Sequence, residues 1–253
     1  MAVATPIRST QMTAAEREAR VNLAALYRLA DHYGWDDLIY NHLAARIPGE
    51  GTFLVKPNDL MFDEVTASSL VKLRLDGEMA DFSQNVNPAG FTIHTSILNA
   101  RPECNYTLHI HTRAGGAISA TKTGILPICQ DTMRFYNRVS YHQFEGVAVD
   151  STECERLARD LGPKNRSLIL KNHGLLTCGE TAAIALSEMR YLVEACETQL
   201  ALQSSGLEIT LPDPEICEKT AKMLEHYGRA GNDAVEWKAY LRIADRLDPS
   251  FRN

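Results

Sequence analysis

The histidine pair in Leu108-His109-Ile110-His111 is the feature that most limits what this chain can form. Successive side chains of a β-strand point to opposite faces, so residues i and i+2 share a face. His109 and His111 would therefore lie on one face with Thr107, while the apolar Leu108 and Ile110 point the other way. Two imidazoles at the end of one strand can bind the same cation, so the pair predicts a sheet with a metal site at a strand end.

A third histidine, His173, follows the apolar segment 167–170 in Asn172-His173-Gly174. Gly174 would allow a tight turn there and leave the imidazole at a strand end. Three histidines plus water form a typical catalytic zinc site, and iron(II) and manganese(II) accept sites with open positions. The same residues also fit a half-buried polar face or a histidine packed in the core, and the pattern alone leaves these interpretations open.

The N-terminal third predicts one helix followed by an antiparallel meander. Thr13 and Glu16 have the spacing of a capping box, with Thr13 as N-cap and Glu16 bonding back to it. The helix should run to about Tyr33, with Gly34 just beyond its end. The alternating segments that follow indicate strands at 43–47, 53–55 and 70–75.

The rest of the chain alternates between helices and strands. A helix is expected from about Phe91 to Ala100, and a second capping box, Asp150 to Glu153, should begin a helix that ends at Leu161. Further helices are predicted at 114–121 and 181–203, further strands at 125–129, 167–170 and 175–178, and two amphipathic helices in the last forty residues or so. This pattern indicates one α/β domain over residues 13–206. Residues 207–253 form a helical extension that packs on the same domain or on a neighbouring subunit.

Composition excludes several classes of protein. The 253 residues carry a formal net charge of -6 and no basic run, which argues against a nucleic-acid partner. No segment approaches the roughly 18 apolar residues of a membrane span, and the N-terminus lacks the apolar core of a signal peptide. The six cysteines are scattered without a C-x-x-C motif, so we expect a cytoplasmic protein with reduced thiols.

Four motifs in order resemble one superfamily: Asn87 to His94 (NPAGFTIH), Ala100-Arg101-Pro102, His109 to Thr112 (HIHT), and Asn172 to Leu175 (NHGL). They are similar to the class II aldolase and adducin head-domain superfamily over roughly residues 15–205. The segments Asp63 to Lys72 and Asn41-His42 resemble the adducin branch more than the sugar-phosphate aldolases.

The resemblance implies a three-layer α/β/α fold around a central, mostly antiparallel sheet. It also implies a homotetramer with active sites between subunits. Family enzymes hold zinc with three histidines, which correspond here to His109, His111 and His173. The metal acts as a Lewis acid on a small hydroxy-carbonyl or hydroxy-acid substrate and stabilises an enediolate during aldol cleavage or decarboxylation.

The sequence departs from the aldolases at the proton-transfer group. The position that carries a glutamate general acid/base in those enzymes is Gly90 here. His94 and Tyr136 are the candidate catalytic replacements, and Glu64 and Glu145 are more distant ones.

The substrate-binding segments depart as well. The small Gly/Ser/Thr loops that bind phosphate in the aldolases correspond to segments in which Asp59 would repel an anion. This departure argues against a phosphorylated sugar substrate but leaves phosphate binding open, because Asn41 and Lys56 could still bind a carboxylate or a phosphate. The candidate substrate-binding residues are Asn41, Lys56, Asn58 and Asn172.

Three functions fit these features. The first is a divalent-metal-dependent lyase of class II aldolase type, with Zn2+ or alternatively Fe2+ or Mn2+. The second is an iron(II)-dependent oxygenase that cleaves carbon–carbon bonds of hydroxy or aromatic acids. The third is a non-catalytic, adducin-like interaction module. Trp237, Tyr240 and Arg242 of the C-terminal extension are further candidates for reaching a neighbouring subunit's site.

Overall fold

The computed structural model describes residues 12–76, 85–146, 152–227 and 232–253 of the chain. Its core is a seven-stranded sheet with the strand order β3-β2-β1-β4-β7-β6-β5. Neighbouring strands run antiparallel except β5 and β6, which are parallel. The strands are β1 (His42–Ile47), β2 (Thr52–Val55), β3 (Val71–Arg74), β4 (Tyr106–Ile110), β5 (Val139–His142), β6 (Ser167–Leu170) and β7 (Gly174–Gly179).

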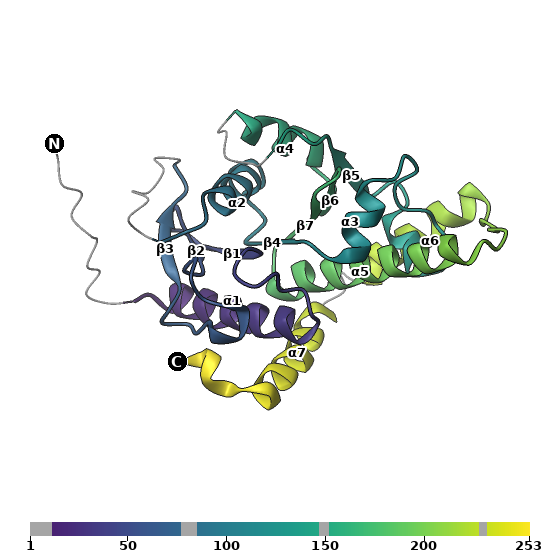
Figure 1. Ribbon diagram of the computed structural model, residues 1–253. Helices are drawn as coiled ribbons and strands as arrows, with labels where there is room; N and C mark the ends of the chain where they lie inside the picture. The colour runs from purple at the N-terminus through teal and green to yellow at the C-terminus, as the bar shows by residue number, and fades with distance from the viewer. Residues whose placement is uncertain (1–11, 77–84, 147–151, 228–231) are drawn as a thin grey trace.

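Helices cover both faces of this sheet, which confirms the three-layer α/β/α architecture (Figure 1). One face packs against α1 and α5, and the other packs against α2 and α4. The helices are α1 (Ala14–His32), α2 (Pro88–Ala100), α3 (Arg113–Ser119), α4 (Glu153–Leu161), α5 (Ala182–Ser205), α6 (Pro214–Tyr227) and α7 (Asp233–Leu247).

The side chains of β1 alternate between the two faces of the sheet, so this strand packs against both helix layers. Leu43, Ala45 and Ile47 are buried toward α1 and α5, whereas Ala44 packs with Phe91 of α2 on the other face. The strand β4 lies beside β1, with His109 opposite His42 and Thr107 opposite Ala44. The polar residues of both central strands therefore share the layer between the sheet and α2.

The helix termini follow the predicted capping chemistry in part. Thr13 caps α1 by accepting a hydrogen bond from the backbone N–H of Glu16, and Gly34 adopts the left-handed conformation just beyond the helix. The side chain of Glu16 does not bond back as predicted, because its carboxylate binds Arg20 and Lys72 instead. A charge-assisted pair of this kind is stronger than a bond to a neutral N–H.

Two other helix starts differ from the prediction. The helix α2 begins at Pro88 rather than near Phe91, because Asn87 caps it and proline suits a first turn that needs no N–H. Asp150 of the second capping box lies outside the described residues, and α4 begins at Glu153 after Thr152, whose side chain makes no capping bond.

The predicted strand 125–129 is wrong. Side chains hold this segment instead of a neighbouring strand: the N–H of Ile125 donates to the hydroxyl of Tyr141, and the N–H of Leu126 donates to the side-chain oxygen of Gln199. The amide nitrogen of Gln199 also donates to the carbonyl of Gly124. Since these long-range bonds satisfy the backbone, the apolar run needs no place in the sheet.

The C-terminal extension packs on the same chain. The helix α7 contacts α1 and α5, where the indole N–H of Trp237 donates to the side-chain oxygen of Asn22 at 3.1 Å. The helix α6 packs against the 3-10 helix η3 (Thr132–Phe135) and extends away from the body at the right of Figure 1. Among the helices described, none has the length and apolar character that crossing a membrane requires.

Candidate metal centre

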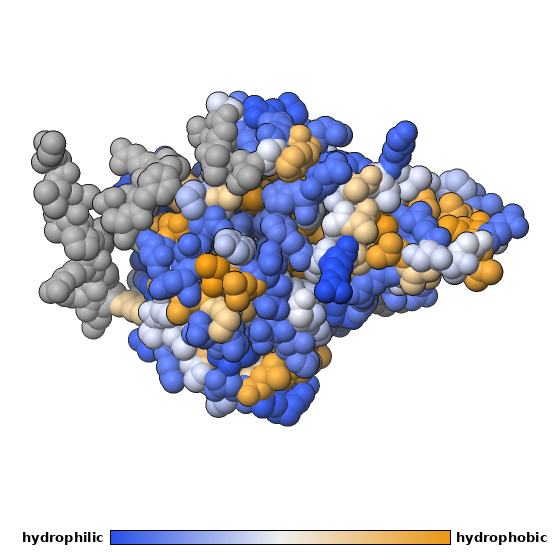
Figure 2. All heavy atoms as spheres, in the orientation of Figure 1, coloured by the Kyte–Doolittle hydropathy of each residue, from blue (hydrophilic) through white to orange (hydrophobic). Residues whose placement is uncertain are grey.

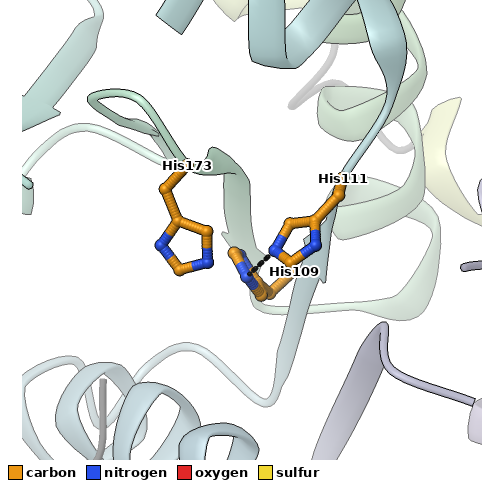
Figure 3. Close-up of side chains that lie close together, drawn as sticks. All are labelled: His109, His111 and His173. Atoms are coloured by element: carbon orange, nitrogen blue, oxygen red, sulfur yellow. Dashed lines mark hydrogen bonds between the residues drawn. The ribbon is translucent and has the colours of Figure 1, made fainter. Parts of the chain in front are cut away.

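The three histidines singled out in the sequence come together at one end of the sheet (Figure 3). His109 lies near the end of β4, His111 is the first residue beyond that strand, and His173 lies in the turn between β6 and β7. One ligand nitrogen from each ring lies within 4.8 Å of the other two. In the part of the chain that the structure describes, this is the only group of histidine, cysteine and carboxylate side chains with that geometry.

Contacts with neighbouring residues hold His109 and His111 in place. Nδ1 of His109 lies 3.0 Å from the carbonyl oxygen of Leu175, to which it donates a hydrogen bond, so its Nε2 presents a lone pair toward the cluster. The backbone N–H of His111 donates to the side-chain oxygen of Asn41 at 3.2 Å. Nδ1 of His111 lies 3.7 Å from a carboxylate oxygen of Asp37. Such contacts around a ligand set its direction and basicity.

The turn that carries His173 differs from the predicted one. The residue with a left-handed backbone is Asn172, with a φ of 56°, and Gly174 has no positive φ. Gly174 is needed for a different reason: a Cβ there would lie 2.7 Å from both the His111 ring and the carbonyl oxygen of Ile110. Glycine therefore lets β7 approach β4 closely enough for His173 to face His109 and His111.

Burial favours the neutral form of all three imidazoles. Burial lowers the pKa of His109 well below its ordinary value of 6.5 and lowers the pKa of His173 to about 4. Burial also lowers the pKa of His111, and the carboxylate of Asp37 opposes that shift. Neutral imidazole is the form that binds a metal, so these rings need not lose a proton first.

The donor set fits a divalent ion such as zinc. The Nε2 atoms of His109 and His111 are 3.0 Å apart, and two nitrogen ligands of one tetrahedral zinc are separated by about 3.3 Å. Three imidazoles are the ligand number of catalytic sites that keep one position for water or substrate. The geometry can therefore hold a metal and still leave it open to a ligand.

A second group of polar residues lies directly behind the cluster. The ring of His42 lies 5.0 Å from that of His109, and its Nδ1 is 2.9 Å from Nε2 of His94. Nδ1 of His94 is in turn 2.6 Å from the hydroxyl of Thr107. Burial lowers the pKa of His94 to about 3 and lowers that of His42 well below 6.5. His94 uses both ring nitrogens inside the protein and is fully buried, so it supports the site from behind.

Sequence reasoning missed His42 as a site residue. Its importance comes from the pairing of β1 with β4, which places it opposite His109 across some 60 or more residues of chain. A signal was present, because a histidine directly precedes the predicted strand 43–47. Only the register of the sheet shows which other residue it meets.

The four predicted substrate-binding residues lie in different environments. Asn41 is buried, and its amide N–H2 donates to the carbonyl of Trp35. The ammonium of Lys56 donates to three backbone carbonyls, and burial lowers its pKa to about 8. Asn58 lines a small cavity beside His42, and Asn172 is exposed in the turn before His173.

The remaining candidates make contacts of their own within the chain. Tyr136 follows η3, which packs on α5 and α6. Glu64 caps its own 3-10 turn by accepting from the N–H of Met61, and Glu145 pairs with Arg156. Trp237, Tyr240 and Arg242 all belong to α7, in the layer on the opposite face of the sheet from α2.

Comparison with known protein families gives a direct match. The family model described as Class II Aldolase and Adducin N-terminal domain matches residues 21–200. A Pseudomonas aeruginosa protein, described provisionally as a class 2 aldolase protein, is 43% identical over 96% of this chain and 95% of its own length. Rat alpha-adducin is 46% identical over 76% of this chain, which corresponds to only 26% of the adducin.

Solved structures agree with the sequence match. The crystal structure of an aldolase II superfamily protein from Pseudomonas syringae has a TM-score of 0.90 and 42% identity, and the match covers 96% of this chain and 98% of that one. The L-fuculose 1-phosphate aldolase from Glaciozyma antarctica PI12 has a TM-score of 0.80 and 27% identity, with 96% of each chain covered.

Proposed function

The chain belongs to the class II aldolase and adducin family, and from that premise we propose that it is a divalent-metal-dependent lyase. Its substrate would be a small hydroxy-carbonyl or hydroxy-acid compound, cleaved by an aldol reaction or by decarboxylation. The single observation that carries the proposal is the convergence of His109, His111 and His173 with their ligand atoms within 4.8 Å. The 27% identical relative named as L-fuculose 1-phosphate aldolase supports the reaction class.

The residues of this chain would share the work as follows. His109, His111 and His173 hold the ion, which supplies Lewis-acid polarisation of a substrate oxygen when bound. The Leu175 carbonyl orients the His109 ring, and the Asn41 side chain holds the backbone of His111 in place. These contacts are formed before substrate arrives, so the site needs little reorganisation.

Proton transfer needs a group other than residue 90, which is glycine. His94 is not that group within this proposal, because both of its ring nitrogens are already hydrogen-bonded. Glu64 and Glu145 are engaged with the Met61 N–H and with Arg156, so Tyr136 is the candidate that we favour, and it would come from the residue after η3 of a neighbouring chain. The proposal therefore includes a homo-oligomer, and a tetramer is the form that the family resemblance implies.

An exposed apolar surface supports that assembly. The arm formed by α6 projects from the body, and Figure 2 shows hydrophobic patches along it. Ile216 and Met223 of this helix are 48% and 49% exposed, and Leu211 just before it is 44% exposed. Apolar residues gathered on a projecting helix suit a contact with another subunit.

Metal content tests the proposal directly. Untagged protein purified without oxygen should contain about one zinc per chain by elemental mass spectrometry, and His173→Ala should lose it while keeping its circular dichroism spectrum. His32→Ala, at an exposed histidine of α1, is the matched control and should keep the metal. Full metal occupancy in His173→Ala would refute the site. Deuterium exchange into dihydroxyacetone, followed by NMR, would report the expected carbon-acid chemistry.

The adducin-like interaction module is the second candidate, because alpha-adducin is 46% identical over 196 residues. It predicts no metal in the purified protein and no uptake on titration with zinc, iron(II) or manganese(II). About one iron(II) per chain, with turnover that requires dioxygen, would instead support the oxygenase. The same measurement thus separates all three functions.

A further inference from the structure

A small cavity lies beside the metal centre on the α2 side of the sheet, and we call it the His42 pocket. Its polar lining comes from Asn41, His42, Lys56, Asn58 and Asn87, with Gly90 of α2 at one side. Its volume is about 10 Å³, which is close to the smallest space that holds one water molecule or one ligand oxygen.

His42 connects this pocket with the candidate metal centre. Its ring lies against that of His109 at a centroid distance of 5.0 Å and an angle of 35°. Its Nδ1 is committed to His94, which is itself anchored on Thr107. The ring is therefore held in one orientation, and Nε2 is its only other polar atom. Within the described residues, no protein group makes a hydrogen bond with that Nε2.

The His42 ring packs directly against position 90 of α2. A Cβ added to Gly90 would lie 3.0 Å from Cγ and Cδ2 of the His42 ring. The ring thus occupies the space that a side chain at position 90 would need. A residue larger than glycine there would have to displace an imidazole that is hydrogen-bonded and buried.

Most other polar groups of the pocket are already used. The three N–H donors of the Lys56 ammonium go to the carbonyls of Ile39, Pro57 and Leu60. The Asn41 side chain both donates and accepts, and the Asn87 side chain caps α2 and donates to the carbonyl of Tyr40. Among the polar side chains that line the pocket, those of His42 and Asn58 therefore remain for an incoming ligand.

We propose that the His42 pocket binds one uncharged oxygen of the substrate, a hydroxyl or carbonyl oxygen, through His42 and Asn58. This inference rests on the proposed metal-dependent lyase and specifies its substrate class as an unphosphorylated hydroxy-carbonyl compound. A phosphate group carries several oxygens that each need a donor, and it would be excluded by the size of the pocket and by the committed donors of Lys56.

A matched pair of ligands tests the substrate class. Zinc-loaded protein is titrated with dihydroxyacetone and with dihydroxyacetone phosphate, which differ only in the phosphate. We expect the neutral ligand to bind at least as tightly. His42→Ala and Asn58→Ala should each weaken its binding about tenfold, the effect of one hydrogen bond, while the zinc content stays at the wild-type level. His32→Ala, the control, should bind as wild type does.

The opposite results would overturn the inference. These are binding of neither ligand, tenfold tighter binding of the phosphate ester, or wild-type affinity in His42→Ala. A high-resolution crystal structure without metal gives a second readout: one ordered oxygen should lie within hydrogen-bond distance of Nε2 of His42. A pocket without that oxygen, or with the Lys56 ammonium turned into it, would refute the assignment. Failure to bind any metal would refute the proposed lyase. The crystal structure would still decide whether the His42 pocket binds an oxygen.

Discussion

Replacing Gly174 by alanine should damage both the sheet and the metal centre. The new Cβ would lie 2.7 Å from the Ile110 carbonyl oxygen and 2.7 Å from Cδ2 of His111, about 0.7 Å short of the 3.4 Å at which ordinary contact begins. Neither neighbour can yield freely, because Ile110 pairs with Leu175 in the ladder between β4 and β7 and the His111 backbone is held by Asn41.

Overpacking of this kind costs about 1–3 kcal/mol, and we expect Gly174→Ala to fall in the upper half of that range because backbone is involved. Displacement of the His111 ring should also raise the zinc dissociation constant at least tenfold, as loss of a supporting contact around a ligand does. Urea denaturation would measure the free energy of unfolding. Competition with a chromogenic chelator would measure zinc affinity.

Gly116→Ala is the matched control. A Cβ at Gly116, in the middle of α3, would meet nothing within 4 Å. That substitution should raise the free energy of unfolding by about 1 kcal/mol through helix propensity and leave zinc affinity unchanged. If Gly174→Ala behaved like Gly116→Ala, the close approach of β7 to β4 would not be the reason for glycine.

The polar groups around the cluster give three more tests. Because burial lowers the pKa of His94 to about 3, the unfolded chain binds a proton at this residue below pH 6.5 that the folded chain does not, so the contribution of His94 to the free energy of unfolding should fall by about 1.4 kcal/mol per pH unit from 6.5 toward 4. His94→Gln should reduce this slope in urea denaturation of metal-free protein and His32→Gln should not; equal slopes would contradict the assignment. Asn41→Ala, which removes the acceptor for the His111 N–H, should cost about 2 kcal/mol and weaken zinc binding, whereas unchanged zinc affinity would limit Asn41 to a packing role. Lys56→Met should cost about 2–4 kcal/mol by leaving three partly buried carbonyls without this donor, with zinc content retained; a wild-type melting curve would show that water replaces the ammonium.

The sequence predicts that the three histidines come together, and the structure confirms it, because their geometry is mostly local. The two-residue period places His109 and His111 on one strand end, and the apolar run 167–170 delivers His173 to the neighbouring turn. The layers of the fold and the family were likewise accessible, since four motifs in order carry the resemblance. The reason given for Gly174 was wrong because it considered only local backbone freedom, whereas the constraint comes from the strand next to it.

Contacts between distant parts of the chain account for the other differences. The segment 125–129 has the composition of a strand, but its backbone donors are taken by Tyr141 and Gln199. Lys56 was expected to bind substrate because its segment corresponds to a phosphate-binding loop of the aldolases, and the sequence does not show that three carbonyls surround its ammonium. Spacing along the chain does not show which polar groups already have a hydrogen-bond partner. Those partners decide which polar groups remain for a ligand.

The cost of burying these histidines bears on whether the candidate metal centre is functional. His42, His94, His109, His111 and His173 converge at one end of the sheet, and burial lowers the pKa of every one of them. Burying a polar ring costs free energy unless each nitrogen finds a partner, and apolar side chains of similar volume would pack there at lower cost. Residues that lower stability in this way are expected where function requires them. A metal bound by three of these rings would offset the free-energy cost of burying them, which packing alone does not. This favours the lyase over the interaction module.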